Sequence, residues 1–350
     1  MKVGLINTYS TYNIGDYAIY SALQKMLIPH TVNAVFTDNS PYTISGINYV
    51  SQLPESDCYV SVGGDIFNNP RQYLITRQFL KNLRQLVSSP KRTILFGQSI
   101  PRSCCGLSFF LLCQVLRQIS AVVVRDQESH QRLRRAGINS VLSYDTAFVL
   151  RRDELADSEA AQRFNRMQLD NDNCVLISLR GFDSLYAYDN SSFINQIIQL
   201  CEGLIKAGKQ PVLLIQADAS INDSDTFMAQ TIQSQVDGLP SINAFQHSKR
   251  VTHSQFLQSV ICHAGMVVAV RYHTAVLALA GGKVPYNLYY SNKGKDLCDR
   301  LNIPGADIHE FDPDAELQVI LSTHNKAFDS KALAHQVTED FNTALSSVHH

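Results

Sequence analysis

Short runs rich in β-branched residues alternate with amphipathic stretches along most of this 350-residue chain. In the first half the predicted strands lie near Val3–Asn7, Val32–Phe36, Cys58–Val62, Thr93–Phe96, Ala121–Val124 and Val141–Tyr144. In the second half they lie near Val175–Leu179, Pro211–Ile215, Ser241–Phe245, Met266–Val270 and Val284–Tyr289. Strands that alternate with helices predict parallel sheets covered by helices on both faces. We therefore expect an α/β fold of two doubly wound, Rossmann-like domains that face a cleft.

The domain boundary is predicted from a break in this alternation. Residues 151–173 form the longest polar run, in which we predict no strand, so we expect them to connect the domains. The N-terminal domain is then 1–150 and the C-terminal domain is 174–325. We expect the last residues, 326–350, to form a helix that packs back on the N-terminal domain.

Composition excludes several classes of protein. Apolar residues make up 45% and charged residues 17%, which is typical of a chain with large hydrophobic cores. The net charge of −1 argues against a nucleic-acid partner, so any anion site must be local. The eight cysteines have no metal-ligand spacing, and we expect free thiols in a reducing compartment and no metal site. With no signal-peptide pattern at the N-terminus, a cytoplasmic location is expected.

The motifs of three common enzyme classes are missing from the sequence. There is no Gly-x-Gly-x-x-Gly, no P-loop and no Gly-x-Ser-x-Gly. This argues against a dinucleotide-dependent enzyme, a kinase and an α/β-hydrolase.

One uncharged segment, Ser103–Leu116, comes nearest to a membrane signal. It is too short to span a bilayer, and we predict a helix in the hydrophobic core. The alternative is an apolar helix that rests on the inner face of the membrane.

Arg271 and His273 carry the strongest functional signal. A β-branched run delivers them, two residues apart, to the start of an apolar helix that Gly281 and Gly282 end. In open α/β sheets, ligands bind beyond the carboxyl ends of the strands, where helix N-termini point N–H groups outward. An arginine and an imidazole at such a place predict an anionic substrate and a proton transfer. The alternative is that both residues only line a domain surface.

Other polar residues also follow predicted strands. Arg180 ends the strand near Val175–Leu179, and Lys293 follows the strand near Val284–Tyr289, so both are candidates for binding phosphate or carboxylate. Asn13, Gly15 and Asp16 open the first helix, where Gly15 allows a close approach and its neighbours cap the helix or contact hydroxyls.

Further candidates follow strands of the first half. Gly63, Gly64 and Asp65 form either a substrate-binding turn with a catalytic base or a simple tight turn. Arg125 to Glu128 are predicted to form salt bridges and a helix cap, and Asp145 either orients an arginine or ends a strand. We interpret His247, His253 and His263 as structural.

The ordered series of these motifs resembles the polysaccharide pyruvyl transferase family. The matching elements are Asn13–Asp16, Gly63–Asp65, Phe96–Ile100, Val124–Ser129, Asp145–Phe148, Ser178–Arg180, Arg271–His273 and Tyr290–Lys293. Two departures concern the N-terminal half. Many members have three glycines where this chain has Gly63-Gly64-Asp65, and a Gly-Pro where it has Pro101-Arg102.

The resemblance implies a fold similar to that of B-type glycosyltransferases and a transferase that needs no cofactor. Such enzymes place the three-carbon unit of phosphoenolpyruvate as a ketal across two hydroxyls of a sugar, in a polysaccharide of the cell envelope, an exopolysaccharide or a lipid-linked precursor. Arg180, Arg271 and Lys293 would hold this donor, His273 would be the acid, and Asp16 or Asp65 the base. Asn13, Gly15, Gly63 and Gly64 would contact substrate. The N-terminal domain would bind the acceptor and the C-terminal domain the donor.

Two other functions stay open on the sequence alone. One is a B-type glycosyltransferase that uses a nucleotide sugar, in which the same cations would bind a diphosphate. The other is a sugar-binding protein without catalysis on the same scaffold. The acceptor sugar and the oligomeric state are not predictable from these motifs.

Overall fold

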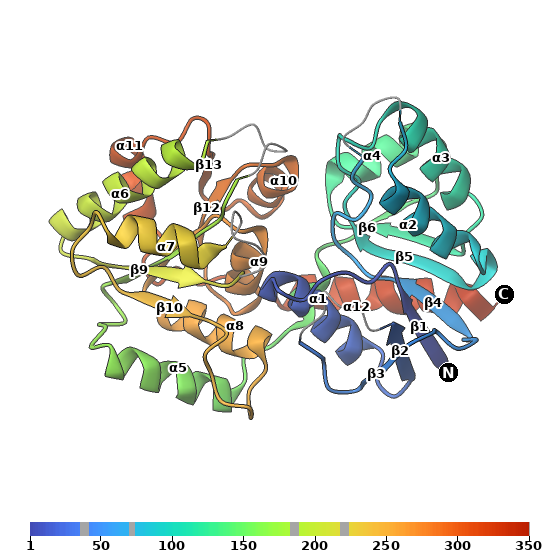
Figure 1. The fold of residues 1–350 in the computed structure, drawn as a ribbon, viewed down its shortest axis with the longest axis horizontal. Coiled ribbons are helices and arrows are strands. Elements are labelled where there is room, and N and C mark those ends of the chain that lie inside the picture. The colour runs from blue at the N-terminus through green and yellow to red at the C-terminus, as the bar shows by residue number, and fades with distance from the viewer. Residues whose placement is uncertain (36–41, 70–73, 183–188, 218–223, 350) are drawn as a thin grey trace. The chain divides into compact units, whose positions relative to one another are not determined.

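The computed structural model describes residues 1–35, 42–69, 74–182, 189–217 and 224–349 (Figure 1). The chain forms two compact units. The first comprises Met1–Thr11, Ile19–Val149 and Lys331–His350, and the second comprises Tyr12–Ala18 and Leu150–Ser330. The prediction placed all of residues 1–150 in one domain, whereas the segment Tyr12–Ala18 packs with the second unit. The division therefore falls within the first helix, α1 (Ile14–Met26).

The first unit is built on a parallel sheet of seven strands in the order β3-β2-β1-β4-β5-β6-β7. The strands are β1 (Lys2–Ile6), β2 (Thr31–Val35), β3 (Ile47–Val50), β4 (Cys58–Ser61), β5 (Thr93–Gln98), β6 (Ala121–Val124) and β7 (Val141–Leu142). All predicted strands of this half are present, although Phe36, the predicted end of one, lies outside the described residues. The edge strand β3 was not predicted.

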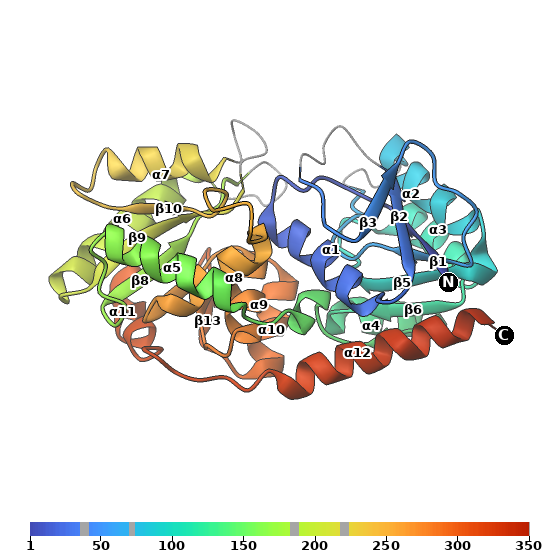
Figure 2. The same ribbon diagram turned by 90° about the horizontal axis from the view of Figure 1, so that it is seen from below.

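Helices cover both faces of this sheet. One face carries α2 (Arg77–Val87), α3 (Gly106–Leu116) and α4 (Gln127–Arg135), which pack with Leu95 and Val122 of the strands into one core. The other face carries the C-terminal helix α12 (Lys331–Ser346), whose Phe341 ring centroid lies 5.0 Å from that of Phe96 (Figure 2). Short 3-10 turns lie at η1 (Pro90–Arg92), η2 (Thr146–Val149) and η3 (Ser347–His349).

Helix α3 differs from the predicted core helix. One side of it is buried through Ser108, Leu112, Cys113 and Leu116. On the other side, Leu107 is 49% exposed and Phe110 is 56% exposed. The prediction of a core position is therefore correct for one side of the helix and wrong for the other.

The second unit is built on a parallel sheet of six strands in the order β10-β9-β8-β11-β12-β13. The strands are β8 (Cys174–Ser178), β9 (Gln210–Ile215), β10 (Ser241–Asn243), β11 (Met266–Ala269), β12 (Tyr286–Tyr289) and β13 (Gly305–Asp307). The helices are α5 (Glu154–Arg166), α6 (Asn190–Lys206), α7 (Asp225–Gln233), α8 (His253–His263), α9 (Tyr272–Ala280), α10 (Asn292–Leu301) and α11 (Pro313–Leu321). The edge strand β13 was not predicted.

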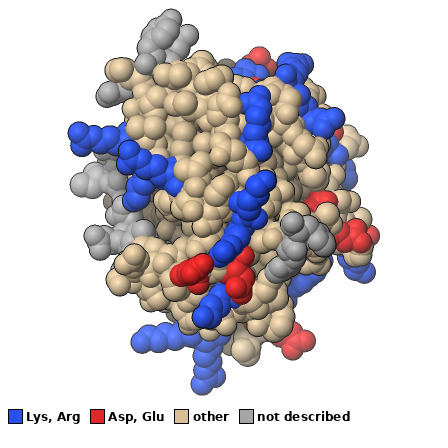
Figure 3. Space-filling view, turned by 90° about the vertical axis from the view of Figure 1, so that its right-hand side faces the viewer, with Lys and Arg blue, Asp and Glu red and all other residues tan. Residues whose placement is uncertain are grey.

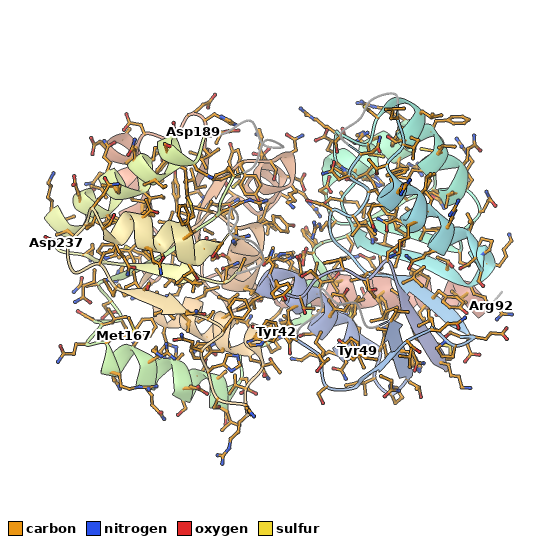
Figure 4. The ribbon with its side chains drawn as sticks, in the orientation of Figure 1. Tyr42, Tyr49, Arg92, Met167, Asp189 and Asp237 are labelled. Atoms are coloured by element: carbon orange, nitrogen blue, oxygen red, sulfur yellow. The ribbon has the colours of Figure 1, made fainter. Side chains whose placement is uncertain are left out.

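The polar run predicted as a connection is largely a helix of the second unit. Asp153 caps α5 by accepting a hydrogen bond from the Ala156 amide (3.0 Å). The helix ends at Arg166, with Met167 as the C-cap residue, and packs on α8. Asp189 caps α6 in the same way through the Ser192 amide (2.9 Å; Figure 4). Polar side chains that cap a helix also occur in loops. The prediction of a connection from polarity alone was therefore wrong for most of this stretch.

All eight cysteines are free, as predicted. Burial raises the pKa of the Cys58, Cys104, Cys174 and Cys201 thiols to about 12, which keeps them protonated and unreactive. Among the described residues, no helix has the length and apolar character needed to cross a membrane.

Candidate active site at the carboxyl edge of the second sheet

Arg271 stands where strand β11 passes into helix α9. The amides of Val270 and Arg271 both donate to Ser178 Oγ, at 2.8 and 3.1 Å, which joins the ends of β11 and β8. Helix α9 is buried along its whole length and ends at Gly281, as the sequence predicts. Arg271 therefore occupies the carboxyl edge of the sheet at the start of a buried helix, the place predicted for an anion-binding residue.

The guanidinium of Arg271 is held by a buried carboxylate that the sequence did not reveal. Arg271 Nη2 lies 2.6 Å from Asp225 Oδ1, and Nε donates to the same oxygen (3.1 Å) and to the Leu179 carbonyl (2.8 Å). The Arg271 and Asp225 side chains are 5% and 0% exposed. Burial raises the pKa of Asp225, while the Arg271 charge and hydrogen bonds favour its ionised form. The ion pair fixes the orientation of the guanidinium.

The other oxygen of Asp225 binds the end of strand β9. Asp225 Oδ2 accepts hydrogen bonds from the amides of Gln216 and Ala217, both at 2.9 Å. The Gln216 side chain in turn accepts a hydrogen bond from Thr274 Oγ1 of helix α9 (2.6 Å). These bonds connect three neighbouring strand ends into one polar network.

The first turn of α1 completes this edge, although it comes from the beginning of the chain. The Ile14 amide donates to the Gln216 carbonyl (3.0 Å), and Asn13 forms a bridge with Ala217. Asn13 Oδ1 accepts a hydrogen bond from the Gly15 amide (2.9 Å), which caps the helix. Asn13, Gly15 and Asp16 thus belong to the same unit as Arg271 and His273.

Gly15 lies directly against the imidazole of His273. A Cβ atom at position 15 would lie 2.4 Å from His273 Nδ1, 2.6 Å from its Cβ and 2.7 Å from its Cγ. No real side chain tolerates such distances, so the glycine is required by the position of the ring. His273 is 8% exposed at the start of α9. The close approach predicted at Gly15 is therefore made, within the protein, to His273.

Two further cations rest on aromatic rings at the same edge. The guanidinium carbon of Arg180 lies 4.4 Å from the centroid of the Tyr290 ring, and Arg180 also donates a hydrogen bond to the Tyr290 hydroxyl. Lys293 Nζ lies 5.3 Å from the centroid of the Tyr272 ring. Both cations are partly exposed, and a ring face orients a cation without neutralising its charge. This part of the edge is suited to binding an anion.

Two of the three histidines predicted to be structural, His253 and His247, lie beside the first turn of α1. His253 packs edge-on against Tyr17, with ring centroids 5.3 Å apart, and His253 Nδ1 lies 2.6 Å from His247 Nε2. Burial, with a smaller contribution from His247, lowers the pKa of His253 to about 4. His253 is therefore neutral near pH 7 and acts as a packing residue.

The first sheet has its own polar carboxyl edge, around Gly63, Gly64 and Asp65. A Cβ atom at Gly63 would lie 2.8 Å from the Gly97 carbonyl, and one at Gly64 would lie 2.8 Å from the Tyr9 hydroxyl. Gly64 also has a φ of +114°, which L-residues rarely adopt. Close contacts with Gly97 and Tyr9 are thus sufficient to explain both glycines.

Asp65 is one of two carboxylates that bind Arg125. Arg125 Nη2 lies 2.9 Å from Asp65 Oδ1, and Nη1 lies 2.6 Å from Asp145 Oδ2. The Arg125 and Asp145 side chains are 1% exposed, whereas that of Asp65 is 33% exposed. Asp145 orients an arginine, one of its two predicted roles. Asp65 is thus held by an ion pair with a buried arginine, and its partly exposed carboxylate is suited to accept hydrogen bonds.

The sequence of this chain matches the model of a known protein family over most of its length. The model of the polysaccharide pyruvyl transferase family matches residues 13–292, from Asn13, which directly precedes α1, to the start of α10. The chain belongs to the polysaccharide pyruvyl transferase family. A search of curated proteins gives no match.

Solved structures show that the chain has the fold of B-type glycosyltransferases, as predicted. A UGT transferase from Siraitia grosvenorii in complex with UDP is 9% identical, with a TM-score of 0.56 and all of both chains covered. Sucrose-phosphate synthase from Thermosynechococcus elongatus is 12% identical, with a TM-score of 0.53 and 99% and 94% covered. UDP-N-acetylglucosamine 2-epimerase from Rickettsia bellii is 8% identical, with a TM-score of 0.52 and 99% and 96% covered. At these identities the similarity concerns the fold alone.

The predicted site residues divide between the two units of the chain. The second unit contains Asn13, Gly15, Asp16, Arg180, Arg271, His273 and Lys293, and the first contains Gly63, Gly64 and Asp65. The two predicted bases, Asp16 and Asp65, therefore lie in different units. Among the described residues, no cluster of three or more His, Cys, Asp or Glu side chains could hold a metal ion.

Sequence reasoning missed Asp225, Gln216 and the roles of the Tyr272 and Tyr290 rings. A usable signal for the rings was present, because each tyrosine stands within three residues of a predicted site residue. No local pattern pairs Asp225 with Arg271, since the two are far apart in the sequence.

Proposed function

We propose that this chain transfers the pyruvyl unit of phosphoenolpyruvate to two hydroxyls of a sugar, forms a cyclic ketal and releases phosphate. The observation that carries the proposal is the packing of His273 against Gly15. This contact brings together two segments that are distant in the sequence, Asn13–Asp16 and Arg271–His273. Both belong to the series of motifs that resembles the pyruvyl transferase family, and they meet at one sheet edge that is rich in cations.

The donor carries a phosphate and a carboxylate, and the cations of the second unit suit both groups. Arg180 and Lys293 are partly exposed and oriented by tyrosine rings. Arg271 is held by Asp225, so its guanidinium needs no reorganisation when an anion binds. We assign Arg180 and Lys293 to direct contacts with the donor. We assign Arg271 to the buried part of the donor site, where Asp225 fixes its orientation.

The reaction requires one acid and one base. His273 donates a proton to the methylene carbon of phosphoenolpyruvate, while a sugar hydroxyl adds to the neighbouring carbon and loses its proton to the base. The second hydroxyl then attacks the same carbon, and the bond from that carbon to the phosphate oxygen breaks. The proton of the second hydroxyl leaves with the phosphate. Once the base has returned its proton to His273 by way of water, the two hydroxyl protons account for the new methyl hydrogen and the released hydrogen phosphate.

Asp16 is the stronger candidate for the base. It lies beside Gly15 in the first turn of α1, in the same unit as His273. Asp65 is ion-paired with the buried Arg125, so we assign it to hydrogen bonds with the acceptor sugar. The first unit would then bind the acceptor, a cell-envelope polysaccharide, an exopolysaccharide or a lipid-linked precursor, inside the cell where phosphoenolpyruvate is made.

Thermal-shift measurements with phosphoenolpyruvate, UDP and GDP test the proposal, because a ligand that binds only the native state raises the unfolding temperature. Stabilisation by phosphoenolpyruvate alone supports pyruvyl transfer. Stabilisation by UDP or GDP alone would instead indicate a nucleotide-sugar glycosyltransferase, and no effect of any of the three would indicate a sugar-binding protein.

A further inference from the structure

One stretch of the first unit has a large excess of positive charge, which the rest of the chain lacks. Between Arg77 and Arg135 there are 11 lysines and arginines but only two acidic residues, Asp126 and Glu128, in a protein of net charge −1. This stretch forms α2, α3 and α4, which all cover one face of the first sheet. The excess of positive charge is therefore concentrated on one layer of helices.

Many of these cations are exposed on the outer side of the layer. Helix α2 exposes Arg77, Lys81 and Arg84, and α4 exposes Arg134 and Arg135. Neither acidic residue offsets them, because Asp126 is buried as the cap of α4 and Glu128 is paired with Arg102 at 2.6 Å. Figure 3 shows basic side chains among broad apolar or uncharged areas on the side of the molecule that it presents.

Apolar side chains stand among these cations. Leu107 and Phe110 of α3, one helical turn apart, are about half exposed, as are Leu80 and Val87 of α2 to a smaller degree. Helix α3 itself carries no charge. Arg132 of α4 holds α3 in position. Its guanidinium carbon lies 4.7 Å from the centroid of the Phe109 ring, and the guanidinium also donates to the Ile100 and Pro101 carbonyls. These contacts attach α3 to α4 through Phe109 and leave the next residue, Phe110, 56% exposed.

We propose that this outer side of α2, α3 and α4 docks on an anionic lipid surface. Acidic headgroups would neutralise the arginines and lysines, and the boundary between headgroups and acyl chains would bury Leu107 and Phe110. A nucleic acid would satisfy only the cations and leave both apolar side chains in water. The 11-residue helix α3 is too short to enter as a span, so the contact is peripheral. The inference does not depend on pyruvyl transfer.

Co-sedimentation of the full-length protein with phosphatidylcholine vesicles, with and without 30% phosphatidylglycerol, tests the docking surface. We expect binding to the anionic vesicles only, weakened by salt because exposed charges are screened. Leu107→Ser with Phe110→Ser should weaken it at least about tenfold, since two half-exposed apolar side chains lose their burial. Arg134→Gln with Arg135→Gln should also weaken it about tenfold or more.

Matched controls come from the second unit. Phe227 is 51% exposed on α7, and Lys249 and Arg250 are an exposed basic pair, so Phe227→Ser and Lys249→Gln with Arg250→Gln should bind as the wild type does. Circular dichroism establishes that each variant is folded. The proposal is overturned if the wild type ignores anionic vesicles, if the controls lose binding equally, or if the Leu107/Phe110 variant binds normally. In the last case, equal binding to duplex DNA would identify a general polyanion surface.

Discussion

The ring of His273 lies so close to the backbone of Gly15 that a methyl group at position 15 would fall 2.4 Å from Nδ1. The two residues are more than 250 positions apart in the sequence, yet both belong to the second unit. Through this contact the first turn of α1 becomes part of the edge that carries Arg271. The candidate active site therefore depends on a helix that begins in one unit and continues in the other.

Gly15→Ala should displace either His273 or the first turn of α1. We expect at least a tenfold loss of transferase activity and a lower unfolding temperature, because the three ring and side-chain atoms cannot all move aside within a packed site. Gly203→Ala is the matched control, since it is also helical and its nearest neighbour would be 3.6 Å away. That variant should be as stable as the wild type or slightly more so.

A double-mutant cycle separates this contact from a general effect on α1. His273→Gly removes the three atoms nearest to a Cβ at position 15. In the His273→Gly background, Gly15→Ala should therefore lower the unfolding temperature much less than it does in the wild type. Equal losses in both backgrounds would show that the glycine is needed for another reason.

Asp225→Asn should destabilise the second unit strongly. The substitution keeps the shape of the side chain but leaves the buried Arg271 charge uncompensated, and breaking such a pair costs about 3–5 kcal/mol. Urea unfolding measures the change in the free energy of unfolding. Asp299→Asn, which breaks an exposed pair with Lys295, should cost less than about 1 kcal/mol. If the two variants are equally stable, Asp225 does not hold Arg271 as described.

Arg180→Ala should weaken the binding of phosphoenolpyruvate by at least about tenfold, the loss expected for a charge-assisted contact. Its effect on stability should be small, because Arg180 is partly exposed on the Tyr290 ring. This makes Arg180 a cleaner test of donor binding than Arg271, whose removal would also leave Asp225 buried without its partner. Calorimetric titration measures the affinity, with the exposed Arg250→Ala as a control. Unchanged affinity in Arg180→Ala would remove Arg180 from the donor site.

Acid should destabilise the packing of His253 on Tyr17. The pKa of His253 is lowered to about 4, whereas an unfolded histidine titrates near pH 6.5, so the unfolded state binds the proton more readily. The contribution of His253 to stability is fully present above about pH 6.5 and is lost as the pH falls towards 4.

Unfolding by urea between pH 7.5 and pH 4.5 measures this dependence. His253→Phe keeps a ring beside Tyr17 and does not titrate, so its stability should fall less steeply with acid. His335→Phe, at a side chain that is 72% exposed on α12, should leave the slope unchanged. A wild-type slope in His253→Phe would contradict the assignment.

The sequence was sufficient to predict the strands that are buried within each sheet, because strands covered on both faces need continuous apolar, β-branched runs. It was insufficient for the edge strands β3 and β13, whose residues, Ile47–Val50 and Gly305–Asp307, form no such run. Residues 151–173 were predicted to be a connection, although most of them form α5. The prediction was wrong because residues that cap a helix also occur in loops.

For the candidate site, the sequence predicted which strand ends carry Arg180, Arg271 and Lys293. It could not predict that Asp225 pairs with Arg271, or that residues 12–18 pack with the second unit. Both facts depend on tertiary contacts between distant segments, and no local periodicity encodes such contacts.

The role of His273 as the proton donor is the central claim, and one substitution tests it most directly. Release of phosphate from phosphoenolpyruvate can be measured with methyl glycosides that differ in their free hydroxyl pairs, alongside calorimetric binding of phosphoenolpyruvate. His273→Gln should bind the donor within about threefold of the wild type and lose turnover by roughly 10²–10⁴-fold. Normal turnover in His273→Gln would contradict the account.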